Sequence, residues 1–228
     1  MKLAVGVDVV DLQDPRARDR SGDTRFMGRV FSPSERERIL SAADPALELW
    51  VLWGAKEAAF KVVSKLLGAP PTFQHNAFRV LDPPGVVASR LAYEGLAVQL
   101  GLDVHPQRVM VWAWNGPSPE ILVAQCRIPD ALHSLELSAQ VDEWRTDRFN
   151  PREMEAVRGL PSALVRLMAR RDAARMLRTP ETRLAITCPP GFTGLRPPYL
   201  ERDGKLMEEA DISLSHDGTQ LAWAIRVS

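Results

Sequence analysis

The stretch from Leu49 to Leu67 limits what this chain can fold into more than any other, because it is apolar almost all round yet carries charge. It reads LWVLWGAKEAAFKVVSKLL, a pattern that predicts a helix buried on most of its faces. Lys56, Glu57 and Lys61 nevertheless lie in its middle, and burying such charges costs several kcal/mol unless a partner compensates them. Glu57 and Lys61 are spaced i, i+4 and share a face of the helix. They form either a structural salt bridge or part of a site for a metal ion or a phosphate.

Length and composition exclude several classes of protein. The chain has 228 residues, with 29 Lys and Arg against 29 Asp and Glu, and this balance gives no overall reason to expect binding to nucleic acid or to a membrane. Cys126 and Cys188 lack the spacing of metal ligands and are too few for a disulfide framework, which favours a reducing compartment. The apolar run at the N-terminus is too short for a signal peptide, and no stretch is long enough to span a membrane. We therefore expect a cytoplasmic protein.

The first half of the chain reads as a strand, then helices, then further strands. Residues 3–12 are rich in β-branched side chains and predict a buried strand. Ser32, Pro33 and Glu35 have the spacing of a capping box with proline in the first turn, which predicts the start of a helix. Further strands are predicted over residues 72–80, 108–114 and 121–128, the last two joined by a hairpin turn, with a helix or covering segment over residues 86–100.

The second half repeats this order after a polar linker. Residues 131–150 lack a hydrophobic pattern, and they separate a half of residues 1–130 from a half of residues 151–228. The sequence Lys56-Glu57-Ala58-Ala59 also aligns with Arg171-Asp172-Ala173-Ala174. The sequence therefore predicts an α+β fold of two similar halves related by a pseudo-twofold axis, each with a main helix packed on a small antiparallel sheet. In the second half the expected elements are a helix over residues 161–178 and strands over residues 182–187, 212–214 and 220–227.

Asp8 and Glu57 are the two carboxylates that are hardest to explain by packing. Asp8 lies within the predicted buried strand, where aspartate is rare unless it is hydrogen-bonded, paired or metal-bound. Two such carboxylates brought together would repel each other unless a hard cation lay between them. Mg²⁺ takes one or two protein carboxylates together with phosphate oxygens and water. Such a pair favours phosphoryl chemistry, whereas each residue alone is also explained by a structural hydrogen bond or salt bridge.

A third group of polar residues lies near the C-terminus. Residues 213–218 read SLSHDG, and consecutive serine, histidine and aspartate do not indicate a hydrolase triad, which is defined in space. His216 is either an ordinary turn residue or a hydrogen-bond donor to phosphate, and Arg196, in the preceding loop, has the same two interpretations. Arg158 precedes the second main helix and is another candidate for binding an anion, against the simpler interpretation of a solvated charge.

Together these motifs resemble the signatures of the 4′-phosphopantetheinyl transferase superfamily. Gly6-Val7-Asp8 matches the pattern G-[IV]-D, and residues 53–61 match W-x-x-K-E-A-x-x-K at every fixed position. Residues 213–216 resemble the serine–histidine motif of the family. The second match is the most specific, being long and complete, whereas residues 81–150 add little to the resemblance.

The order of the motifs resembles a circular permutation. The small trimeric carrier-protein synthases of the family have the order found here, in shorter chains. In the larger two-lobed monomeric members, the serine–histidine half comes first and runs directly into the G-[IV]-D strand. Joining residue 228 to residue 1 recreates that continuous segment. The chain thus resembles a circular permutant of the two-lobed type, for which a monomer is the simplest expectation.

The resemblance implies a function and a role for each matched residue. It implies Mg²⁺-dependent transfer of 4′-phosphopantetheine from coenzyme A to a serine of an acyl or peptidyl carrier protein. Asp8 and Glu57 would hold Mg²⁺ against the coenzyme A pyrophosphate, Glu57 or a water it holds would take the serine proton, and Lys61 would steady the phosphate charge. The nucleotide end of coenzyme A would be bound by Ser215, His216 and Arg196.

One departure from the family pattern leaves another function open. Two-lobed members often carry an acid two residues after the metal-binding aspartate, where this chain has Val10, and Asp11 alternates onto the opposite face of the strand. The main alternative is therefore a catalytically silent relative that binds coenzyme A or a carrier domain as an accessory subunit. A coenzyme A thioester enzyme is a weaker alternative, because neither cysteine has an evident base partner.

An arginine-rich segment follows the strand that contains Asp8. It is either a solvated loop, balanced by nearby aspartates, or a surface that attracts an acidic helix of a carrier protein, as basic surfaces near this position do in the family. Its basic residues are Arg16, Arg18, Arg20, Arg25 and Arg29.

Overall fold

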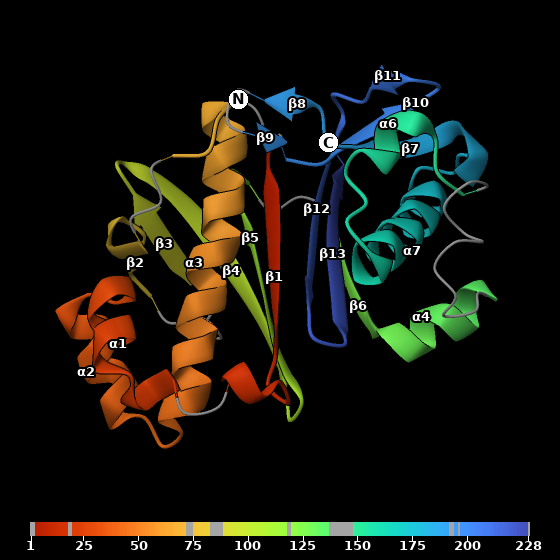
Figure 1. The fold of residues 1–228 in the computed structure, drawn as a ribbon. Helices are drawn as coiled ribbons and strands as arrows, with labels where there is room; N and C mark the ends of the chain where they lie inside the picture. Colours follow the sequence, from red (N-terminus) through yellow and green to blue (C-terminus); the bar gives the residue numbers. More distant parts are fainter. Residues whose placement is uncertain are drawn as a thin grey trace. The chain divides into compact units, whose positions relative to one another are not determined.

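The computed structural model describes residues 3–17, 20–71, 75–82, 89–117, 120–136, 148–191, 194–195 and 197–227. Two compact units make up the chain, Met1–Pro117 and Ser118–Ser228. Figure 1 shows a long helix in each unit, α3 (Pro45–Leu67) and α7 (Leu160–Met176), beside antiparallel strands of the same unit. The predicted α+β class, with a main helix packed on an antiparallel sheet in each half, is therefore confirmed. None of the described helices is long and apolar enough to cross a membrane.

The first unit is built on a five-stranded antiparallel sheet in the order β1-β5-β4-β3-β2. The core between this sheet and α3 contains many small and β-branched side chains, among them Ala55, Ala59, Val62, Val109 and Val111, together with larger aromatic and leucine side chains. The strands are β1 (Val5–Asp11), β2 (Arg79–Val80), β3 (Arg90–Tyr93), β4 (Leu96–His105) and β5 (Arg108–Trp114). The shorter helices are η1 (Pro15–Ala17), η2 (Arg20–Gly22), α1 (Thr24–Val30), α2 (Pro33–Ser41) and η3 (His75–Ala77).

A glycine at position 6 lets α3 lie directly against β1. A Cβ atom at Gly6 would come within 2.1 Å of the Ala58 carbonyl oxygen and 3.2 Å of Lys61 Cβ, so no larger residue fits there. Alternate residues of a strand share a face, and the even-numbered residues of β1 therefore face α3. Asp8 is one of them, and this places its carboxylate on the helix side of the sheet.

The second unit contains a three-stranded sheet in the order β12-β13-β6 and a second one in the order β11-β10-β7. Leu164 and Met168 of helix α7 share one buried core with Ile186, Trp223 and Ile225 of these sheets. The strands are β6 (Glu120–Arg127), β7 (Leu184–Thr187), β8 (Pro190–Gly191), β9 (Gly194–Leu195), β10 (Tyr199–Arg202), β11 (Lys205–Leu206), β12 (Ala210–Asp217) and β13 (Gln220–Val227). The other helices are α4 (Ile128–Leu135), α6 (Pro151–Met154) and η4 (Glu181–Arg183).

The main predicted elements are found, and the differences concern the type of some segments and the pairing of others. The strand predicted over residues 72–80 is present only as β2, because η3 precedes it and residues 72–74 lie outside the described residues. For residues 86–100 the sequence predicts a helix or a covering segment, and the helical alternative is wrong in the described part, because β3 and β4 occupy it. The hairpin predicted between residues 108–114 and 121–128 is also wrong, because β5 pairs with β1 and β4, whereas β6 pairs with β13. Apolar alternation marks each strand correctly but does not say which neighbour it pairs with.

The pairing of β6 moves the division between the two units to residue 117, ahead of the predicted boundary at residue 130. Helix α4 occupies the beginning of the predicted linker, and residues 137–147 lie outside the described residues. The pseudo-twofold relation between the halves stays a prediction, since each unit is described by itself.

A buried glutamate fastens α2 to α3 in the first unit. Ser32 and Glu35 form the predicted capping box, in which Glu35 Oε2 accepts the Ser32 N–H at 2.8 Å. The same carboxylate lies 2.9 Å from Lys56 Nζ of α3 and accepts the Val80 N–H of β2 at 3.3 Å. Because each charge compensates the other, both are buried without an unpaired ion.

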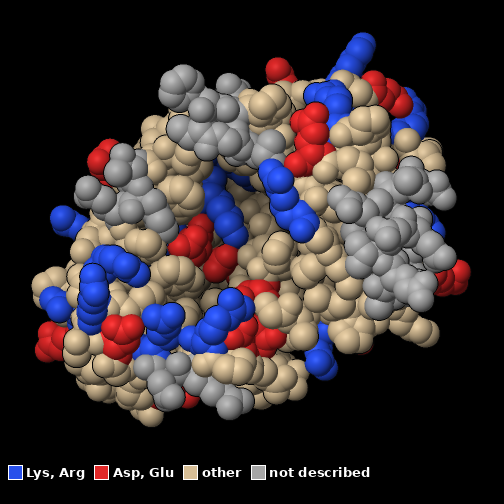
Figure 2. Space-filling view, viewed as in Figure 1, with Lys and Arg blue, Asp and Glu red and all other residues tan. Residues whose placement is uncertain are grey.

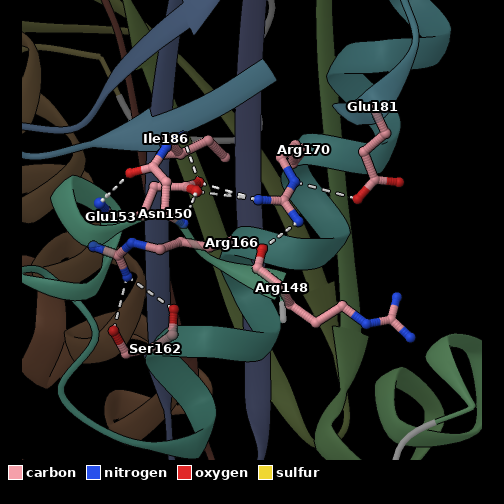
Figure 3. Close-up of polar contacts among 8 residues, drawn as sticks. All are labelled: Arg148, Asn150, Glu153, Ser162, Arg166, Arg170, Glu181 and Ile186. Atoms are coloured by element: carbon pink, nitrogen blue, oxygen red, sulfur yellow. Dashed lines mark hydrogen bonds and ion pairs between the residues drawn. The ribbon is translucent and has the colours of Figure 1, made fainter. Parts of the chain in front are cut away.

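The second unit contains the same arrangement, as Figure 3 shows. Asn150 and Glu153 form a capping box at the start of α6. Glu153 ion-pairs with Arg170 of α7 at 3.2 Å and accepts the Ile186 N–H of β7 at 2.9 Å. A carboxylate at the start of a short helix thus joins the main helix to a strand in both units, and we call this arrangement the glutamate clamp.

One sequence motif, Phe-[Ser/Asn]-Pro-x-Glu, produces both clamps, at residues 31–35 and 149–153. In each, the leading aromatic ring packs on the clamped cation, at 5.7 Å from Lys56 Nζ in the first unit and 5.6 Å from the Arg170 guanidinium carbon in the second. The contacts pair Lys56 with Arg170, one residue before the Arg171 of the predicted alignment. An internal repeat is therefore present, displaced by one residue from that alignment.

Candidate functional site

Lys61 links α3 to the Asp8 carboxylate of β1. Its ammonium donates to Asp8 Oδ1 at 2.9 Å and to the Val7 carbonyl oxygen at 2.6 Å. Asp8 is only 8% exposed, whereas the Lys61 side chain is 28% exposed. An ammonium has three N–H donors, and among the described residues Lys61 uses two of them in these bonds. The remaining donor is therefore available to a ligand on the exposed side.

Glu57 lies on the same face of α3, one turn before Lys61. Burial and the neighbouring Asp8 carboxylate raise the pKa of Glu57 to about 7, against the opposing effect of the Lys61 ammonium. A carboxylate raises the pKa of another only when the two are close enough to repel. The structure thus brings together three of the predicted site residues, Asp8, Glu57 and Lys61, which come from elements far apart in sequence.

His75 also borders this site, although sequence reasoning did not select it. Its Nε2 atom lies 3.7 Å from Glu57 Oε1, and its ring stacks on Trp53 with the centroids 5.1 Å apart and the planes at 26°. Burial and the charges of Lys56 and Arg29 lower the pKa of His75, so its imidazole is neutral near pH 7. No regular spacing marks this histidine in the sequence, because it belongs to η3 and only the tertiary structure places it beside α3.

Asp8 and Glu57 are the two carboxylates of this site, and among the described residues no group of three or more His, Cys, Asp and Glu is placed to hold a metal ion. Val10 packs into the hydrophobic core under α3. Asp11 Oδ1 accepts the N–H of Gln13 at 3.0 Å. The donor set is therefore the small one that Mg²⁺ accepts when substrate phosphate and water complete its shell.

The two other lysines within residues 56–65 make structural contacts. Lys56 donates to the carbonyl oxygens of His75 and Phe78 at 3.0 and 2.6 Å, and Lys65 donates to that of Val5 at 2.8 Å. Both lysines are buried. Lys61 alone of the three is both partly exposed and paired with a site carboxylate.

The predicted nucleotide-binding residues belong to the second unit. Ser215 and His216 lie on β12, where Ser215 is buried and His216 is exposed. Arg158 is exposed between α6 and α7, and Arg196 lies outside the described residues. Because the two units are described separately, the meeting of this group with the carboxylates of the first unit stays a prediction.

The arginine-rich segment after β1 is partly neutralised by its own aspartates. Arg16 forms an ion pair with Asp14 at 2.7 Å, and Arg20 forms one with Asp23 at 3.3 Å. Figure 2 shows basic and acidic side chains interspersed on the visible face rather than gathered by sign. Arg18 lies outside the described residues. The exposed arginines of α1 are Arg25 and Arg29.

Comparisons with known proteins give a match to a family model and a match to a curated relative. Residues 4–104 match the family model described as the 4′-phosphopantetheinyl transferase superfamily. Over 68 residues the chain is 40% identical to the holo-[acyl-carrier-protein] synthase of Chlorobaculum parvum, an alignment that covers 29% of this chain and 54% of that protein. The chain thus spans about half the length of this curated relative.

A solved structure is also similar. The crystal structure of Thermotoga maritima holo-[acyl-carrier-protein] synthase aligns with a TM-score of 0.38 and 18% sequence identity, covering 53% of this chain and 67% of that one. The matched residues 4–104 contain Asp8, Glu57 and Lys61. The family match confirms the resemblance predicted from the motifs.

Proposed function

Because residues 4–104 match the family model of the 4′-phosphopantetheinyl transferase superfamily, we propose that this chain transfers 4′-phosphopantetheine from coenzyme A to a serine of an acyl or peptidyl carrier protein. The name of the Chlorobaculum parvum relative, a holo-[acyl-carrier-protein] synthase, supports this reaction class. The proposal includes Mg²⁺ as the metal and coenzyme A as the donor substrate.

One observation carries the proposal: Asp8 and Glu57 lie close enough for Asp8 to raise the pKa of Glu57 to about 7, beside a lysine that is partly exposed. Two carboxylates and an ammonium at one place suit a reaction in which phosphate charge must be held while a hydroxyl is activated. A purely structural ion pair would need only one of the two acids.

The residues of this site take separate roles in the proposed reaction. The carrier serine oxygen forms a bond to the phosphorus that bears phosphopantetheine, and the bond from that phosphorus to the bridging oxygen breaks, releasing adenosine 3′,5′-bisphosphate. Glu57 takes the proton of the serine hydroxyl, directly or through a water, for which a pKa near neutrality is well suited. Lys61 donates its remaining N–H to a phosphate oxygen as charge develops there.

Mg²⁺ fits the donor set that the structure provides. The mutual repulsion of Asp8 and Glu57, expressed in the raised pKa of Glu57, is the condition that a bound cation relieves. Asp8 and Glu57 would hold the ion, and it would neutralise the pyrophosphate when coenzyme A is bound. Val10, buried in the core, adds no ligand.

The remaining parts of the proposal concern substrate and partner binding. Ser215, His216, Arg158 and Arg196 would bind the nucleotide end of coenzyme A. The exposed α1 arginines would face an acidic helix of the carrier protein. A monomeric circular permutant of the two-lobed type is the form we propose. The free thiols of the two cysteines suit a cytoplasmic protein.

The direct test is labelling of apo carrier proteins with a fluorescent coenzyme A in the presence of Mg²⁺. We expect the wild type to label at least one carrier of a panel drawn from fatty acid, polyketide and peptide synthesis. Glu57→Gln should abolish labelling, whereas Glu37→Gln, at an exposed position of α2, should leave the rate unchanged. Labelling by Glu57→Gln at the wild-type rate would show that the assigned role of Glu57 is wrong.

The alternative function is that of a silent relative, and the same panel distinguishes it. Carrier or coenzyme A binding without any labelling across the panel would favour an accessory subunit over an enzyme. Val10 favours this alternative, because it is buried in the core at a position where two-lobed members often carry an acid.

A further inference from the structure

His75 is held against α3 at two points. Its backbone carbonyl oxygen accepts a hydrogen bond from Lys56 Nζ at 3.0 Å, and its imidazole stacks on Trp53 at 5.1 Å between centroids. Trp53 precedes Glu57 by one helical turn, and Lys56 precedes it directly. The backbone contact fixes where His75 lies, and the stack fixes the plane of its ring.

This placement brings one imidazole nitrogen to the Glu57 carboxylate. His75 Nε2 lies 3.7 Å from Glu57 Oε1, a little longer than the usual N–H···O bond of about 2.7–3.2 Å. Hydrogen bonds at active sites are often long without substrate and shorten in the complex. Because the ring is held by its stack on Trp53, we expect the shortening to come from movement of the Glu57 side chain.

The two charged neighbours of Glu57 have opposite effects on its ionised carboxylate. Asp8 repels its ionised form and Lys61 attracts it, while Lys61 is already bonded to Asp8. A hydrogen bond from a third group would favour one orientation of the carboxylate. A neutral donor on a fixed ring supplies one, as partners behind reactive carboxylates do elsewhere.

We propose that His75 is a positioning residue, whose Nε2–H holds the Glu57 carboxylate in the orientation that the transfer reaction requires. This rests on the proposed function, in which Glu57 takes the serine proton and helps to hold Mg²⁺. His75 acts through Glu57 and touches neither substrate. Trp53, the first residue of the W-x-x-K-E-A-x-x-K motif, is then the platform that fixes the imidazole.

Two substitutions of His75 separate the hydrogen bond from the stack. His75→Phe keeps an aromatic ring on Trp53 but removes the donor. His75→Gln removes the stack but keeps an N–H near the place of Nε2. His105→Phe, at an exposed position of β4, is the matched control. For each protein we would measure kcat and KM for coenzyme A in carrier labelling, the Kd for Mn²⁺ by electron paramagnetic resonance with coenzyme A present, and the thermal midpoint.

We expect His75→Phe to lower kcat and weaken Mn²⁺ binding, each by about 10- to 100-fold, with little change in the KM for coenzyme A or in the thermal midpoint. His75→Gln should recover much of both losses, and His105→Phe should match the wild type. A purely structural role predicts the reverse order, with the phenylalanine variant active and the glutamine variant impaired. That result, or equal impairment of both variants, would overturn the proposal.

A further measurement decides the matter if the phenylalanine variant does not fold. The ¹⁵N chemical shift of His75 Nε2 should change on Glu57→Gln at constant pH, and an unchanged shift would overturn the proposal. Failure of the proposed function looks different from failure of this inference. If the proposed function is wrong, the wild type itself labels no carrier and binds no Mn²⁺, and the proposed role of His75 is then wrong as well.

Discussion

Glu35 in the first unit and Glu153 in the second make the same three kinds of contact, to a helix-capping N–H, to a strand N–H and to a buried cation of the main helix. The clamp therefore sets a common register for α3 and α7, in which Lys56 corresponds to Arg170. Glu57 and Lys61 lie one and five residues after Lys56. In the same register, the residues one and five positions after Arg170 are Arg171 and Arg175. The second unit thus carries an arginine at the position of Glu57, so the carboxylate that we propose as the proton acceptor has no counterpart in α7.

Breaking a clamp should destabilise the unit that contains it. Glu35→Ala leaves the Lys56 ammonium buried without its carboxylate, and Glu153→Ala does the same for Arg170. We expect each variant to lose about 3–5 kcal/mol of unfolding free energy in urea titrations. Glu37→Ala, at an exposed position of the same helix as Glu35, should change it by less than about 0.5 kcal/mol. A loss of similar size in the control would mean that the clamp is not the cause.

A methyl group at position 6 should separate α3 from β1. The added Cβ atom of Gly6→Ala would overlap the Ala58 carbonyl oxygen, at 2.1 Å, so the helix must shift away from the strand. We expect a loss of about 1–3 kcal/mol in stability and a larger loss of carrier labelling, because Lys61 is carried by the part of α3 that moves. Gly22→Ala, where nothing lies within 4 Å of the new atom, is the control. Full activity in Gly6→Ala would show that the site does not depend on this close contact.

Asp8, Glu57 and Lys61 could be selected from the sequence because charge inside an apolar strand or helix is a local pattern. Each of the three stands out against its immediate neighbours, and burial alone makes it unusual. The capping box at Ser32 and Glu35 was predictable for the same reason, since its residues are three apart. Local spacing was sufficient wherever the contacts themselves are local.

His75 and the partner of β6 could not be read from the sequence, because tertiary contacts decide them. His75, at the start of η3, acquires its surroundings from Trp53 and Glu57 of α3, which are 22 and 18 positions earlier in the sequence. The alternation in β6 is equally compatible with pairing to β5 or to β13, and only the assembled sheet selects β13. The second clamp is an intermediate case, since the repeated Phe-[Ser/Asn]-Pro-x-Glu motif is visible in the sequence but its cation is not.

Removing the Lys61 charge should change the pKa of Glu57, in addition to breaking the hydrogen bond to Asp8. The Lys61 ammonium lowers the pKa of Glu57 against the larger effects of burial and Asp8, so Lys61→Met should raise that pKa further. We expect a ¹³C-detected titration of Glu57 to move its midpoint above the wild-type value. Carrier labelling should fall by about 100-fold or more, as it does when one donor to developing charge is lost. Lys205→Met, at an exposed position of the second unit, should change neither quantity.

The raised pKa of Glu57 predicts a stability that falls as pH rises. In the unfolded chain this carboxyl ionises around its ordinary pKa of 4.5, whereas in the folded chain it keeps its proton up to about pH 7. Between these values the folded state binds more protons, so the unfolding free energy decreases with pH until it levels off above the folded pKa. Glu57→Gln lacks this titration. In metal-free buffer it should match the wild type near about pH 4 and exceed it by up to about 3 kcal/mol near about pH 8. Urea titrations in EDTA at the two pH values measure the difference, with Glu37→Gln as the matched control, and a gap that stays constant across the range would contradict the assignment of the shifted pKa to Glu57.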